Sequence, residues 1–164
     1  MTDLKVGDKA PEFTLTNERG FPVSLKNFVG SKIVVLYFYP KDFTSGCTKE
    51  ACSFRDDYHI YEEKGVEVIG ISLDSQESHK KFSEKHNLPF SLLSDNQKEV
   101  AKQYGVLGFG SMLTKRVTFI IDKKGKIARI FPKVNIKKHS KEVLELINKI
   151  STWTNKNKKY VGFL

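Results

Sequence analysis

Short apolar runs, rich in β-branched and aromatic residues, alternate along the chain with longer segments of mixed polarity. The run KIVVLYFY, residues 32–39, is continuous and ends at Pro40, which is typical of a strand buried on both faces. VEVIGISLD, residues 66–74, has the same character and predicts a second buried strand. Between these runs, residues 48–64 contain neither Pro nor Gly, and Gly65 follows them. This pattern predicts a helix that ends with glycine just past its last turn.

The rest of the chain continues the alternation of strands and helices, with turns marked by Gly, Pro, Asn and Asp. Near the C-terminal end, apolar residues recur at helical spacing over residues 139–153 and predict a helix with one face on the sheet. The other predicted elements are an extended region over 12–29 turned at Arg19-Gly20, a helix from Ser75 or Ser78 to about His86, a turn over 87–89, a short strand over 90–93, a helix over 98–104 ended by Gly105, and strands over 117–121 and 127–131 joined by a hairpin turn at 122–125.

The order of these elements predicts an α/β protein. A strand–helix–strand–helix start favours parallel strands, and the later hairpin adds antiparallel ones. The expected result is a thioredoxin-like fold, a mixed central sheet flanked by helices on both faces. We expect one domain over residues 1–153 and a mobile, Lys-rich tail over 154–164, in which Phe163 and Leu164 could dock on the domain. In open α/β sheets, reactive sites lie beyond the carboxyl ends of strands.

Composition and charge limit the kinds of function that the chain could have. The 164 residues are 39% hydrophobic, enough for an ordinary core. The net charge of +9 comes mainly from scattered lysines, with mild clusters at 137–138 and 156–159 and no Arg-rich stripe. A solvated surface is therefore favoured over a nucleic-acid site. No stretch approaches the roughly 20 apolar residues of a membrane span, and the N-terminus lacks the apolar core of a signal peptide. We expect a cytoplasmic protein without nucleic-acid or membrane partners.

Candidate chemistry centres on the two cysteines of the chain, Cys47 and Cys52. Cys47 ends a polar turn and precedes the predicted helix over 48–64. A thiol in this position faces the positive end of the helix dipole and free backbone N–H groups. Both favour the thiolate, which is the reactive form. Cys47 is therefore a candidate nucleophile, and Cys52 is a second thiol that could complete its chemistry.

Three residues that precede Cys47 in the sequence support its interpretation as a nucleophile. Pro40 ends the strand and can shield a thiolate from water, Thr44 has a hydroxyl that can donate to sulfur, and Gly46 allows close approach of backbone N–H groups to a small ligand. Each residue alone has an ordinary structural explanation, such as an N-cap for Thr44. Their joint spacing at the carboxyl end of a strand is more informative, because together they would form a pocket for two linked oxygens.

The segment YPKDFTSGCTKEAC resembles the active-site segment of peroxiredoxins, and the second cysteine five positions after the first is similar to the bacterioferritin comigratory protein or peroxiredoxin Q subfamily. The likeness extends over about residues 4–152 and includes VGDKAPEFTL, GISLDS, FSLLSD and RVTFIIDKKGKI. Ser45 departs from the subfamily, which often has Pro there. That difference should soften the turn without removing a catalytic group.

The resemblance implies a thioredoxin-like peroxidase that reduces hydrogen peroxide and organic hydroperoxides, as part of antioxidant defence. It implies thioredoxin as the electron donor, no cofactor, no metal, and a monomer. The implied site residues are Cys47 as peroxidatic cysteine, Cys52 as resolving cysteine in an intramolecular disulfide, Thr44 and Pro40 as the active-site pair, Arg116 as an arginine that reaches the site from a later strand, and Glu50 as the residue that holds that arginine.

Helix geometry adds a constraint on the implied disulfide. Residues i and i+5 of an ideal helix have Cα atoms roughly 8–9 Å apart, whereas a disulfide needs less than about 7 Å. We therefore predict that residues 48–51 unwind when Cys47 and Cys52 join.

Three alternatives stay open at this point. A disulfide oxidoreductase of thioredoxin type would share the sheet, but its cysteines are normally two residues apart. A metal module could use Cys47, Cys52 and a histidine such as His59 or His79, although the spacing is poor and the histidines are expected at the surface. A non-enzymatic protein could act through its basic surface and retain these residues as relics.

Overall fold

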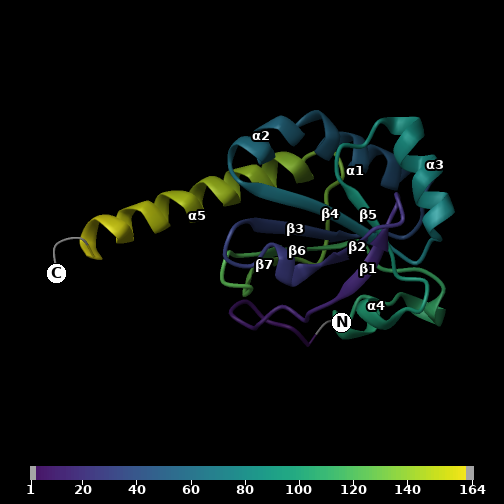
Figure 1. Cartoon of the computed structure of the whole chain (residues 1–164), viewed down its shortest axis with the longest axis horizontal. Helices are drawn as coiled ribbons and strands as arrows, with labels where there is room; N and C mark the ends of the chain where they lie inside the picture. Colours follow the sequence, from purple (N-terminus) through teal and green to yellow (C-terminus); the bar gives the residue numbers. More distant parts are fainter. Residues whose placement is uncertain (1–2, 162–164) are drawn as a thin grey trace.

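The computed structural model describes residues 3–161, and within them one sheet of seven strands forms the centre of the molecule (Figure 1). The strands lie in the order β2-β1-β5-β4-β3-β6-β7. Their bounds are Thr14–Asn17 for β1, Pro22–Ser24 for β2, Ile33–Phe38 for β3, Val66–Ser72 for β4, Ser91–Ser94 for β5, Val117–Ile121 for β6 and Ile127–Phe131 for β7.

The two longest apolar runs form the centre of the sheet. Strands β3 and β4 pair in parallel with Val35 opposite Val68, and β5 pairs in parallel with β4. Strand β6 pairs antiparallel with the other side of β3, so that Val117 lies opposite Phe38. The start of β6 therefore meets the carboxyl end of β3, which positions the residue before β6 beside the loop after β3.

Two apolar layers cover the sheet, one on each face. Alternate residues of β3 contribute to different layers, as period-2 side-chain alternation requires: Val34 and Leu36 belong to one, Val35 and Tyr37 to the other. The layer that contains Tyr37 is covered by helices α1 (Ser45–Asp56), α2 (Tyr58–Glu63), α3 (Gln76–His86) and α5 (His139–Val161), and the opposite layer by α4 (Glu99–Gln103) (Figure 1). This is the mixed sheet with helices on both faces that the sequence predicts.

The helix predicted over 48–64 differs from the observed one in two respects. Helix α1 already begins at Ser45, with Thr44 as its N-cap residue in an extended conformation, so Cys47 lies in its first turn. The helix then breaks at Asp57, and α2 follows. The Asp57 carboxylate accepts a hydrogen bond from the Ser140 hydroxyl at 2.7 Å, so a contact from α5 accompanies the break.

Helix α5 continues beyond the boundary predicted at residue 153. It runs to Val161, because neither Pro nor Gly interrupts the chain before Gly162. Its second half extends away from the sheet (Figure 1). The mobility expected for 154–164 stays a prediction, and Phe163 and Leu164 lie outside the described residues. Within the described part of the chain, no helix is both long and apolar enough to cross a membrane.

Candidate active site

Cys47 lies in the first turn of α1, at the carboxyl end of β3. The side chain is 1% exposed and packs in the apolar layer that contains Tyr37. Helix α1 begins where the Thr48 N–H donates to the Thr44 carbonyl at 2.9 Å. Because the first N–H groups of a helix have no partner within it, the sulfur lies at the positive end of the helix dipole.

Arg116 joins Cys47 to a buried carboxylate. Its Nη2 donates to Cys47 Sγ at 3.2 Å, and its Nη1 donates to Glu50 Oε1 at 2.7 Å. Glu50 lies one helical turn after Cys47 and its side chain is 1% exposed. Arg116 directly precedes β6, so the pairing of β6 with β3 carries the guanidinium to this end of the sheet. The structure therefore brings together three of the predicted site residues.

The charges of this cluster depend on each other. Burial raises the pKa of Glu50 from 4.5 to about 7, against the opposing attraction of Arg116. Burial alone would lower the pKa of Arg116, but Glu50 and Cys47 outweigh it and raise that pKa above its ordinary value. Glu50 Oε2 is buried and has no hydrogen-bond partner among the residues that the structure describes. Arg116 is thus a cation in contact with the sulfur of Cys47 and with a carboxyl group whose pKa lies at about 7.

Gly46 leaves room for the guanidinium. A Cβ at this position would lie 3.1 Å from Arg116 Nη2 and 3.0 Å from Ile136 Cδ1, closer than nearly all such contacts in proteins. The sequence suggests that this glycine admits a ligand. The structure gives a second reason for a glycine here, since any larger residue would compete with Arg116 for space.

Thr44 and Pro40 lie in the loop between β3 and α1. The Thr44 hydroxyl is exposed and donates to the carbonyl of Lys41 at 2.7 Å, and it makes no capping bond to α1. Pro40 is half-buried. Both residues therefore border the turn that contains Cys47, while the hydroxyl of Thr44 is engaged with the loop backbone.

Cys52 lies further along α1 and is half-buried. Both cysteines are free thiols. They belong to one uninterrupted helix, so the geometric constraint predicted from the sequence applies to this structure. Cys52 Sγ lies 3.9 Å from Nδ1 of His86, at the end of α3.

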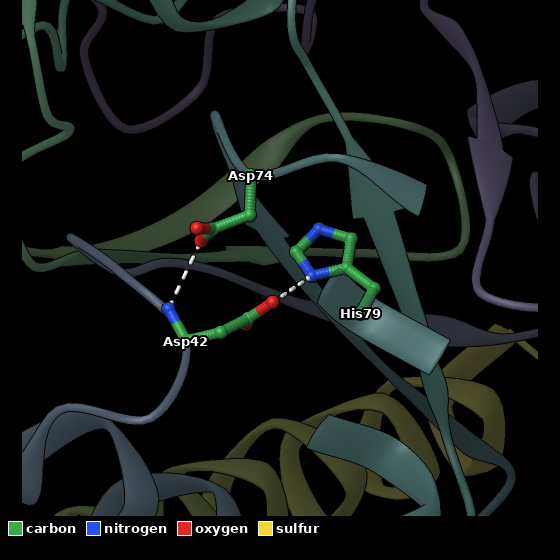
Figure 2. Close-up of side chains that lie close together, drawn as sticks. All are labelled: Asp42, Asp74 and His79. Atoms are coloured by element: carbon green, nitrogen blue, oxygen red, sulfur yellow. Dashed lines mark hydrogen bonds and ion pairs between the residues drawn. The ribbon is translucent and has the colours of Figure 1, made fainter. Parts of the chain in front are cut away.

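A buried polar network holds the loop that precedes Cys47, and the sequence analysis did not find it. Figure 2 shows Asp42, from this loop, between Asp74 and His79. The Asp42 N–H donates to Asp74 Oδ2 at 2.9 Å, and its Oδ2 lies 2.7 Å from His79 Nδ1. His79 Nε2 lies 3.0 Å from the carbonyl oxygen of Leu93. The ring of His79 is therefore held between the carboxylate of Asp42 and the backbone of β5.

The surface position expected for the histidines is wrong for His79, which is 0% exposed, and for His139, which is 1% exposed. It holds for His59, and His86 is half-buried. Asp42 further accepts hydrogen bonds from the hydroxyls of Tyr39, at 2.6 Å, and Ser78, at 2.8 Å. The sequence signal that could have revealed the network is positional. Asp42 and Asp74 follow neighbouring parallel strands, whose carboxyl ends meet at one edge of the sheet.

The same three residues are the one group, among those described, with ligand atoms close enough to hold a metal ion. The group contains neither cysteine, so the metal module considered from the sequence does not form around Cys47 and Cys52. The facing atoms of Asp42 and His79 already share a hydrogen bond (Figure 2). In this structure, the three side chains therefore hold one another and the loop that precedes Cys47.

Comparison with known proteins identifies the class to which this fold and site belong. The model of the AhpC/TSA family matches residues 6–130, a range that includes the cysteines and Arg116. The chain belongs to the AhpC/TSA family.

Individual relatives indicate the subfamily within the AhpC/TSA family. Peroxiredoxin Bcp of Bacillus subtilis is 44% identical over 154 residues, covering 90% of this chain and 98% of its own length. Chloroplastic peroxiredoxin Q of Sedum lineare is 47% identical over 147 residues, covering 88% and 78%. The crystal structure of peroxidoxin BcpB from Mycobacterium tuberculosis matches with a TM-score of 0.83 at 36% identity, covering 90% of this chain and 98% of that one. The resemblance to the bacterioferritin comigratory protein and peroxiredoxin Q subfamily is confirmed, together with the thioredoxin-like fold, and the enzyme class is that of the thiol-dependent peroxidases.

Proposed function

We propose that the protein reduces hydrogen peroxide and organic hydroperoxides through Cys47, that Cys52 resolves the oxidised cysteine, and that thioredoxin restores both thiols. The observation that carries this proposal is the contact of Arg116 with Cys47 Sγ at 3.2 Å, beside buried Glu50. The guanidinium can stabilise negative charge on this sulfur, and the thiolate is the form that attacks peroxide.

In the first step the Cys47 thiolate attacks the terminal oxygen of the peroxide. The S–O bond forms as the O–O bond breaks, and the departing alkoxide or hydroxide takes up a proton to leave as an alcohol or water. Negative charge moves from sulfur to oxygen, and Arg116 can donate along that path because its guanidinium presents several N–H groups in one plane. A donor to such developing charge contributes about 3–4 kcal/mol in comparable sites.

In the second step the sulfenic acid on Cys47 condenses with the Cys52 thiol, forming a disulfide and releasing water. Both residues lie on α1, so residues 48–51 must leave the helical conformation. The hydrogen bonds of Thr48 to the Thr44 carbonyl, from its N–H at 2.9 Å and from its hydroxyl at 2.8 Å, are among those expected to break. Amide exchange across residues 44–54 should increase in the oxidised protein, and identical exchange in both states would refute the unwinding.

Reduction of the disulfide by thioredoxin would complete the cycle. The direct experiment is peroxide-dependent oxidation of NADPH in the presence of thioredoxin and its reductase, measured for wild type, Cys47→Ser and Cys52→Ser. We expect no activity without Cys47 and one turnover without recycling when Cys52 is absent. Full turnover by Cys47→Ser would overturn the proposal, and activity with glutaredoxin but not thioredoxin would correct the donor.

We further propose that the enzyme works as a monomer in the cytoplasm. A pair of reactive cysteines that is returned to thiols in each cycle suits a reducing compartment. Sedimentation equilibrium of reduced and oxidised protein tests the first part, and fractionation of cells that express the native protein tests the second.

A further inference from the structure

The environment of Cys52 suggests how the resolving step is driven. Cys52 Sγ lies 3.9 Å from Nδ1 of His86, within reach of a weak S–H···N hydrogen bond. The contact joins α1 to the last residue of α3, and the two helices lie side by side (Figure 1). No step described above uses this histidine.

Contacts from two helices hold the imidazole in place. Nη1 of Arg55 donates to the backbone carbonyl of His86 at 2.8 Å. The ring packs edge-on against Phe82, with centroids 5.1 Å apart, and Phe82 is fully buried. Because Arg55 lies three residues after Cys52, it shares a face of α1 with the thiol. The pair of Cys52 and His86 is therefore a built arrangement that spans α1 and α3.

The surrounding charges keep the imidazole of His86 neutral. Burial first, and then the positive charges of Lys85 and Arg55, lower the pKa of His86 from 6.5. Lys85 precedes His86 on α3, and Arg55 comes from α1. The imidazole is consequently neutral at pH 7 and able to accept a proton. The same two cations would stabilise a thiolate at Cys52 once the proton has moved.

We propose that His86 is the general base of the resolving step, accepting the Cys52 proton at Nδ1. This inference rests on the proposed Cys47–Cys52 disulfide. The Cys52 thiolate attacks the sulfenic sulfur of Cys47; the S–S bond forms as the S–O bond breaks. Cys52 is oxidised and Cys47 is reduced. The hydroxide that leaves takes the proton back from His86, directly or through water, so that one water is released in total.

The arrangement also indicates which of the two cysteines moves when α1 unwinds. Cys52 stays attached to α3 through His86 and Arg55, so the unwound turn brings Cys47 to Cys52 rather than the reverse. Cys52 can then react as a thiolate as soon as the sulfenic acid on Cys47 reaches it. An ordinary thiol is only a few per cent ionised at pH 7, so loss of the base should slow the step by about tenfold or more.

The test compares His86→Asn and His86→Gln with wild type and with His59→Asn, a matched control because His59 is exposed on α2. Reduced protein is mixed with one equivalent of hydrogen peroxide and quenched with dimedone at successive times between pH 6 and pH 9. Mass spectrometry then gives the amounts of sulfenic adduct on Cys47 and of disulfide. Both His86 variants should lose the sulfenic acid at least tenfold more slowly at pH 7 and recover as rising pH ionises the thiol.

Each other outcome argues against the proposal. Resolution at the wild-type rate in both His86 variants at pH 7 would overturn it. A slow rate that does not recover up to pH 9 would assign His86 a structural role only, and equal slowing in His59→Asn would show that the effect is not specific. Absence of any disulfide in wild type would overturn the proposed resolving step itself, and the role of His86 with it.

Discussion

Arg116→Lys is the most direct perturbation of the site, because it keeps the positive charge and removes the planar guanidinium with its two donor nitrogens. The guanidinium donates to two atoms at once, Cys47 Sγ at 3.2 Å and Glu50 Oε1 at 2.7 Å. A single ammonium cannot occupy both positions, and the buried carboxylate of Glu50 is the stronger attraction. The substitution should therefore leave the sulfur without its charged donor.

The magnitude follows from the lost contact. A hydrogen bond to a charged group contributes about 1.5–3 kcal/mol, and each 1.4 kcal/mol corresponds to tenfold in rate. We expect oxidation of Cys47 to slow by roughly 10- to 150-fold. The ion pair with Glu50 survives in the variant, so its thermal midpoint should lie within a few degrees of wild type.

The assay isolates the first step. In a Cys52→Ser background the reaction stops at the sulfenic acid, and rapid quenching with dimedone gives its rate of formation. Arg19→Lys is the matched control, because Arg19 is exposed at the turn between β1 and β2. If Arg116→Lys forms the sulfenic acid within twofold of the control, the role assigned to Arg116 is wrong.

Three further predictions concern the support of the site. Gly46→Ala should slow the same single turnover by about tenfold, because the added Cβ would lie 3.1 Å from Arg116 Nη2 and displace it. The protein should stay folded, because the atoms that the Cβ would meet are the movable ends of the Arg116 and Ile136 side chains. A wild-type rate would show that Arg116 does not need this space. The pKa of Glu50 is raised from 4.5 to about 7, so between these pH values the folded state holds a proton that the unfolded state releases. The contribution of this proton to the free energy of unfolding is complete below pH 4.5 and is lost as pH rises through 7. Glu50→Gln should accordingly gain a few degrees in thermal midpoint relative to wild type between pH 5 and pH 8, and a constant difference would contradict the assignment. His79→Leu should lower the free energy of unfolding by about 3–5 kcal/mol, because it leaves the buried Asp42 carboxylate without its His79 partner; urea denaturation at pH 7 measures this, and a loss below 1 kcal/mol would refute the importance of this contact.

Local signals were sufficient to predict the strand and turn that carry Cys47. The apolar run of β3 and the proline that follows it act over a few residues, and the sheet then brings the start of β6 to the same end through strand pairing. The chemistry of Arg116 and Glu50 was implied only by resemblance to a family. Nothing in residues 50 and 116 themselves indicates that they meet.

What the sequence did not predict depends on contacts between distant segments. Asp57 resembles any polar residue within a helix, and its bond with Ser140 forms across 83 positions. His79 lies three residues before the buried Phe82, on the same face of α3, but a histidine does not by itself indicate burial. Its burial depends on the carboxylate of Asp42, 37 positions earlier, which gives the polar ring a hydrogen-bond partner that it would otherwise be costly to bury without. Such pairs are determined by the topology of the sheet and not by local pattern.

The site also suggests why unwinding of α1 should follow oxidation rather than precede it. In the reduced protein, Arg116 attaches both Cys47 and Glu50 to the end of β6 and so holds the first two turns of the helix. Formation of the sulfenic acid removes the negative charge from sulfur, and with it a charge-assisted bond of about 1.5–3 kcal/mol. The remaining attachment is through Glu50, whose pKa of about 7 leaves it partly protonated at neutral pH. Loss of the first bond alone would favour local opening by roughly 10- to 150-fold. Oxidation of Cys47 would thus weaken the contacts that keep it away from Cys52, at the stage of the cycle when the two sulfurs have to meet.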